Sequence, residues 1–92
     1  MYQIEGKNFK VFTQIISTDW AEIDLPGKIY SILMKARTAA PVLTIKRYDA
    51  DTDYLTIPAG ESLSIGLSMD ADNHFYLKSD TNPTVVEFLY TE

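Results

Sequence analysis

Hydrophobic and polar residues alternate in short runs along most of the chain, and turn-forming residues separate these runs. The clearest run spans residues 62–69, where four apolar residues alternate with three serines and a glycine. A period of two is typical of a β-strand that buries one face. Helical periodicity is not sustained over three turns anywhere, so the pattern predicts a chain built from strands.

The runs define the expected strands and the turns between them. Residues 29–36 are apolar on both faces, which is typical of a central strand. Proline and glycine in Leu25–Lys28 predict a type II turn, and those in Ile57–Gly60 predict a turn that leads into a hairpin. The expected strands are 9–16, 20–25, 29–36, 42–48, 54–57, 62–69, 74–79 and 84–90. One helical turn capped by Asp19 and Glu22 is the alternative to the strand over 20–25.

Strands spaced at such short intervals predict one all-β domain over residues 1–92. The expected architecture is an antiparallel β-sandwich or small barrel of about seven to eight short strands, with jelly-roll or Greek-key connections. Residues 1–28 are expected to form a less regular N-terminal arm and strand. The large aromatic side chains of Trp20, Phe75 and Phe88 are expected in the core.

The composition of the chain excludes several classes of function. The chain has 13 acidic and 8 basic residues and a formal charge of −5, which argues against nucleic-acid binding because that needs a surplus of lysine and arginine. The absence of cysteine excludes thiolate metal sites and cysteine nucleophiles. The N-terminal residues show no signal-peptide pattern, and no apolar run approaches the ~20 residues that span a bilayer. We therefore expect no membrane association.

Two groups of residues invite a chemical interpretation. Asp49, Asp51 and Asp53 alternate as at the start of a calcium loop, but Tyr54 and Gly60 stand where an EF-hand needs glycine and glutamate. A solvated acidic loop is the favoured interpretation, and a calcium site shared with the Asp70–Asp72 loop is the alternative. His74 is the single imidazole, without a Gly-x-Ser-x-Gly motif to accompany it. We expect no catalytic residues and no cofactor.

Surface contacts are the other source of function. Tyrosines beside the acidic loop can anchor a protein interface or stack on sugar rings, and the small side chains of the 62–69 run permit close approach of a neighbour. The interface candidates are Tyr48, Tyr54, Ser62, Ser64, Ser68 and Tyr76.

Three stretches of the second half carry a family resemblance: Tyr54–Ile65, Phe75–Asp80 and Thr84–Glu92. Over residues 29–92 the chain resembles small β-sandwich accessory proteins of tailed-phage virions. The resemblance implies a capsid cement or decoration protein that stabilises the phage head by binding between major capsid subunits, without catalysis. It implies a virion location after synthesis in the host cytoplasm, and the major capsid protein or other virion subunits as partners.

Three alternatives accompany that interpretation. The first is a tail or fibre component, and the second is a carbohydrate-binding module that uses exposed tyrosines. The third is a small hydrolase that uses His74. Whichever virion role applies, a homo-oligomer, either a dimer or a trimer, is expected.

Overall fold

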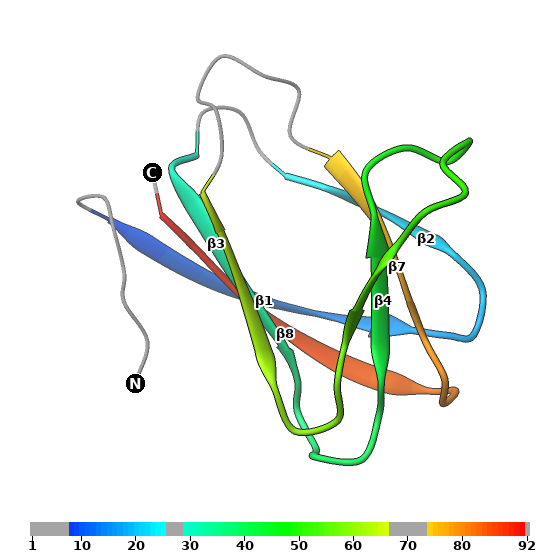
Figure 1. Ribbon diagram of the computed structural model, residues 1–92. Helices are drawn as coiled ribbons and strands as arrows, with labels where there is room; N and C mark the ends of the chain where they lie inside the picture. The colour runs from blue at the N-terminus through cyan, green and yellow to red at the C-terminus, as the bar shows by residue number, and fades with distance from the viewer. Residues whose placement is uncertain (1–7, 26–28, 67–73, 92) are drawn as a thin grey trace.

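The described part of the chain forms eight strands in two four-stranded antiparallel sheets, as the computed structural model shows (Figure 1). The structure describes residues 8–25, 29–66 and 74–91. No helix long and apolar enough to cross a membrane occurs among these residues. The strands are β1 (Phe9–Ile16), β2 (Ala21–Asp24), β3 (Ser31–Ala36), β4 (Leu43–Lys46), β5 (Leu55–Ile57), β6 (Ser62–Gly66), β7 (His74–Ser79) and β8 (Thr84–Thr91).

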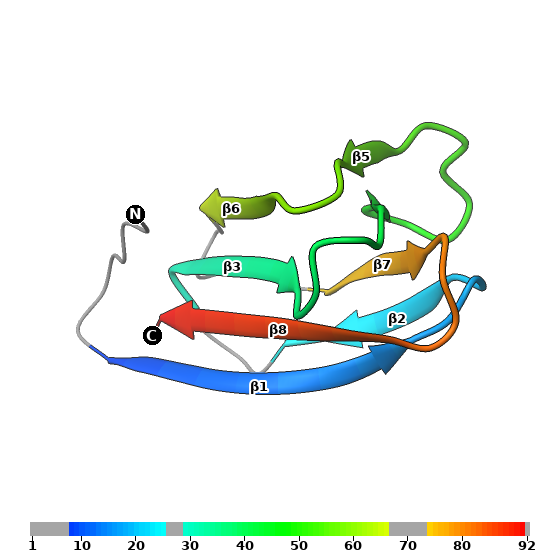
Figure 2. The same ribbon diagram turned by 90° about the horizontal axis from the view of Figure 1, so that it is seen from below.

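Sheet A has the order β1-β8-β3-β6, and sheet B has the order β2-β7-β4-β5. Figure 2 shows sheet A from β6 at the top to β1 at the lower margin. Each step along the chain changes sheet except the β4–β5 hairpin. This is the strand order of a jelly roll, a sandwich of two interlocked Greek keys. The expectation of an all-β sandwich is confirmed, and the strands form two sheets rather than one closed barrel.

The core lies between the sheets and is made by alternate residues of each strand. In β8 and β7 the burial alternates with a period of two, as the sequence pattern predicts. Phe12 of β1 stacks on Phe88 of β8 with ring centroids 4.6 Å apart, and Phe75 of β7 meets Phe88 from the other sheet. The most deeply buried apolar side chains are Ile16, Ile23, Ile29, Ile32, Met34, Leu43, Leu77, Val86 and Phe88.

The expected hairpin after Ile57 is wrong. β5 pairs with β4 in sheet B, whereas β6 pairs with β3 in sheet A, so the segment between them crosses the sandwich. The turn itself is real: the N–H of Glu61 donates to the carbonyl of Pro58, and Gly60 takes φ +80° at its third position. A local turn signal says that the chain bends, but it does not say which sheet the next strand joins.

Trp20 also departs from expectation. Phe75 and Phe88 are buried as predicted, but Trp20 is only half-buried and packs on the outside of sheet B. Its ring lies against the ammonium groups of Lys46 and Lys78, at 4.4 and 4.7 Å from the ring centroid. The apolar aromatic is covered there by two cationic side chains rather than by the core. The expected turn over Leu25–Lys28 falls largely on 26–28, outside the described residues.

Two neighbours in β1 test this arrangement. Ile16 is fully buried between the sheets, while Ile15 is 69% exposed on the outer face. Replacing Ile16 with alanine is expected to lower the free energy of unfolding by about 2–5 kcal/mol, through lost burial and an unfilled cavity. Ile15→Ala is expected to cost less than about 1 kcal/mol, the span of strand propensities. Urea unfolding of both variants measures the difference, and similar losses would contradict the assigned facing of β1.

Candidate functional site

The outer faces of the two sheets differ in chemistry. Directly opposite residues share a face, so the register assigns each side chain to the inside or the outside of the sandwich. The outer face of sheet A carries an apolar region that we call the apolar strip. Its members are Phe9, Val11, Ile15, Leu33, Val85 and Leu89.

One row of the register runs through the middle of the apolar strip. Val11 lies opposite Leu89, Leu89 lies opposite Leu33, and Leu33 lies opposite Ser64 of β6. This row therefore crosses all four strands of sheet A without a charged side chain. Val11 is 62% exposed, and a shallow surface cavity of about 200 Å³ lies beside it.

A polar row crosses the apolar strip and separates Ile15 and Val85 from its other members. It runs from Thr13 through Glu87 and Lys35 to Ser62. The Glu87 carboxylate accepts a hydrogen bond from Nε of Arg37 at 3.0 Å and lies 3.7 Å from Nζ of Lys35. These pairs are partly exposed and stabilise the fold only slightly. The result is an apolar surface divided by one polar row, and protein-binding surfaces likewise combine apolar and polar side chains.

The five interface candidates that the structure describes fall on two opposite faces. Ser62 and Ser64 are exposed on β6, where Ser64 ends the apolar row and Ser62 ends the polar row. Tyr48, Tyr54 and Tyr76 belong to the sheet B side, and Ser68 lies outside the described residues. The structure therefore does not join these residues into one site.

The outer face of sheet B is aromatic and charged. The hydroxyl of Tyr76 donates to the Glu22 carboxylate at 3.0 Å. The His74 ring meets Tyr48 and Tyr76 edge-on, with centroids 6.0 and 6.2 Å away. Trp20 and Tyr54 are tilted by 57°, so these rings do not form a flat platform of the kind on which a sugar stacks.

The acidic loop is organised by a lysine. Nζ of Lys46 donates to the carbonyl oxygens of Asp49 at 2.8 Å and Asp51 at 3.4 Å. The Asp51 carboxylate accepts the N–H of Tyr48. Among the described residues no group of three or more acidic or histidine side chains gathers as a metal would require. Asp53 belongs to the same exposed loop, and Asp70 and Asp72 lie outside the described residues.

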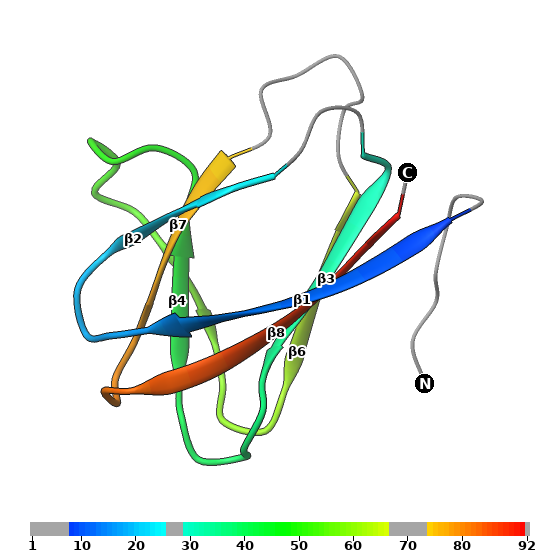
Figure 3. The same cartoon turned by 180° about the vertical axis from the view of Figure 1, so that it is seen from behind.

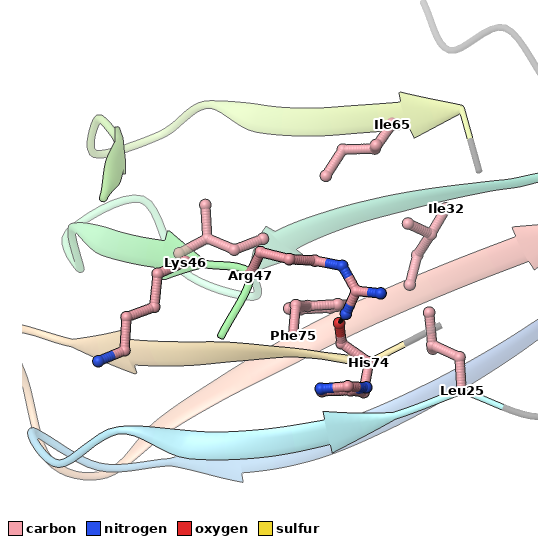
Figure 4. A pocket seen from close by; sticks show the side chains of 8 residues that line it. Leu25, Ile32, Lys46, Arg47, Ile65, His74 and Phe75 are labelled. Carbon is pink, nitrogen blue, oxygen red and sulfur yellow. Dashed lines mark hydrogen bonds between the residues drawn. The ribbon is translucent and has the colours of Figure 1, made fainter. Parts of the chain in front are cut away.

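A cavity of about 220 Å³ opens between the sheets (Figure 4). Leu25, Ile32, Ile65 and Phe75 line it, and the guanidinium of Arg47 lies among them and donates to the carbonyl of His74. The ammonium of Lys46 points away from it. The volume exceeds that of a cavity that holds benzene but is below the ~300 Å³ of drug-sized pockets. Its size suits a small apolar group.

Sequence reasoning missed the apolar strip. Phe9, Val11 and Ile15 stand out as apolar residues in the first run, but the other face of the run also carries two large apolar residues, Phe12 and Ile16. A run that is apolar on both faces is typical of a central strand. β1 is instead an edge strand of sheet A, and sheet B covers only its inner face, so the outer face with Phe9, Val11 and Ile15 is left exposed among the described residues.

Comparison of the sequence with family models, with curated proteins and with solved structures gave no match.

The Tyr76–Glu22 hydrogen bond predicts a pH effect. The bond raises the pKa of the Tyr76 phenol, because the carboxylate favours the protonated hydroxyl; burial and the Glu22 charge raise this pKa further. The folded value lies above the unfolded value of about 10, so the stabilisation is complete below about pH 10 and is lost as pH rises through the folded value. NMR titration of the tyrosine rings measures it. Glu22→Gln is expected to lower the pKa of Tyr76, and an unchanged value would contradict the assigned cause.

Proposed function

We propose that this protein is a non-catalytic structural protein that binds other protein subunits through the apolar strip of sheet A. The observation that carries the proposal is the uncharged row Val11–Leu89–Leu33–Ser64 across the outer face of that sheet. A solvated antiparallel sheet normally presents polar side chains to water. Three large exposed apolar residues on one edge strand depart from that rule, which supports burial against a partner.

The family resemblance suggests which protein the apolar strip binds and where. Within it, the partner is the major capsid protein of a tailed phage, and the protein acts as a cement or decoration protein that holds neighbouring shell subunits together. The jelly roll occurs in capsid and lectin domains, so the fold supports this setting only by analogy. A shell repeats every contact, and modest binding at each site therefore adds up over the lattice.

The opposite face gives less support to carbohydrate binding. Tyr48 and Tyr54 are 54% and 60% exposed, which suits a ligand surface. The Trp20 ring, however, is already in contact with two ammonium groups, and the ring pairs around it are tilted or edge-on. Sheet A therefore remains the favoured binding face.

A charge placed in the middle of the apolar strip tests the proposal. The assay is co-sedimentation of the protein with empty shells assembled from the major capsid protein encoded in the same genome. Leu89→Lys is expected to weaken binding about tenfold or more, a loss of ~1.4 kcal/mol, because the ammonium must be desolvated at the contact. The lysine stem can lie along the sheet with its charge in water, so the free protein is expected to fold.

The matched control is Thr56→Lys, which adds the same charge at an exposed position on β5 of the other sheet. This variant is expected to bind the shells as the unaltered protein does. Equal weakening by both variants, or no binding of the unaltered protein to shells, would contradict the proposal.

A further inference from the structure

The four edge strands of the sandwich differ in how well they are protected against pairing with another chain. β2 has four residues and carries the exposed acids Glu22 and Asp24, and β5 has three residues and ends at Pro58. β6 has five residues and exposes only serine and glycine. Short strands, charges and proline are the usual devices that prevent edge-to-edge association.

β1 has only one of these devices, the charge of Lys10. It has eight residues, without proline, glycine or an acid, and Lys10 is its single charge. One side of the strand pairs with β8 along its whole length, and no described residue pairs with the other side. Figure 2 shows β1 running along the margin of the sheet, and in Figure 3 β1 crosses in front of the other strands of sheet A. In an antiparallel edge strand, alternate N–H and C=O groups point away from the one partner and can pair with a further strand.

We propose that this edge binds a second copy of the same chain, with the two β1 strands antiparallel and Phe12 on the two-fold axis. The proposal does not depend on a virion role. Extension of the sheet requires that outward-facing residues lie opposite outward-facing residues, which limits the symmetric registers to those centred on a residue. Centring on Phe12 places Val11 opposite Thr13, Phe9 opposite Ile15 and Lys10 opposite Gln14 of the partner copy.

The neighbouring registers are less favourable because of Lys10. Centring on Val11 would place Lys10 opposite Phe12, and centring on Thr13 would place it opposite Ile16, which is fully buried. Either choice sets an ammonium against an inward-facing apolar side chain. Only the register centred on Phe12 places Lys10 opposite a polar side chain, that of Gln14.

Charge also favours a second copy at this edge. The chain carries −5 overall, so most surfaces of two copies repel each other. β1 contributes no acid, and it brings together the apolar strips of the two copies in one continuous eight-stranded sheet. The dimer would thus present the row through Val11, Leu89 and Leu33 twice, related by the two-fold axis.

Disulfide trapping tests both the edge and the register, because the chain has no cysteine of its own. Val11→Cys, Thr13→Cys and the control Thr56→Cys replace exposed side chains, so each variant is expected to fold. Opposite residues in an antiparallel pair have Cα atoms about 4.5–5.5 Å apart, within disulfide range. Mild oxidation of mixed Val11→Cys and Thr13→Cys proteins is expected to give a covalent dimer at least about tenfold faster than oxidation of Thr56→Cys.

The single variants discriminate between registers. Thr13→Cys alone would cross-link fastest if Thr13 were on the axis, and Val11→Cys alone would do so if Val11 were. Either result overturns the proposal, as does a mixture that cross-links no faster than Thr56→Cys. Light scattering of the unaltered protein is expected to give the mass of two chains, and a monomer at the concentrations used for trapping also overturns it.

Charge substitutions test the proposed β1–β1 contact without introducing cysteine. Gln14→Lys places an ammonium opposite Lys10 of the partner copy twice per dimer, and it is expected to raise the dissociation constant about tenfold at low salt. Adding Lys10→Glu in the same chain is expected to restore dimerisation. Failure of this rescue in folded protein would contradict the register. Binding of Leu89→Lys to shells does not enter either measurement, so this inference and the proposed function can fail separately.

Discussion

The pairing of β8 between β1 and β3 holds sheet A together. β8 is the last strand of the chain, and it joins residues 9–16 to residues 31–36 through two full antiparallel ladders. Its inward side chains, Val86, Phe88 and Tyr90, are buried, and Phe88 contacts aromatic rings from both sheets. Without β8, β1 would have no partner strand among the described residues. Its contacts join distant parts of the chain, which is typical of slowly folding β-proteins.

The alternation of the chain between the two sheets decides which residues share a surface. Successive strands lie in different sheets everywhere except at the β4–β5 hairpin. The outer face of sheet A is therefore assembled from four segments that are far apart in sequence: 9–15, 31–35, 62–66 and 85–91. The same alternation separates Ser62 and Ser64 from Tyr54, although only a few residues stand between them. The proposed binding surface thus follows a register row and not a motif that is continuous in the sequence.

The outer faces of the two sheets differ in whether their side chains already have contacts within the domain. On sheet B, polar contacts are satisfied within the face, as in the Tyr76–Glu22 bond and the cover of Trp20 by lysines. On sheet A, apolar side chains remain exposed on an edge strand that carries a single charge. Exposed apolar area and a free edge in the same strand are features that proteins normally avoid, and burial against another protein removes both.

The sequence by itself determined the strands and their facing, because a period of two follows from strand geometry alone. The span of β1, the burial of Phe75 and Phe88, and the central place of β3 all agree with the pattern. Only the tertiary structure decided that β5 and β6 belong to different sheets and that Trp20 packs on the outer face of sheet B. It also decided that β1 is an edge strand of sheet A. These outcomes depend on pairing between distant segments, and local turn and hydrophobic patterns carry no information about which strands become neighbours.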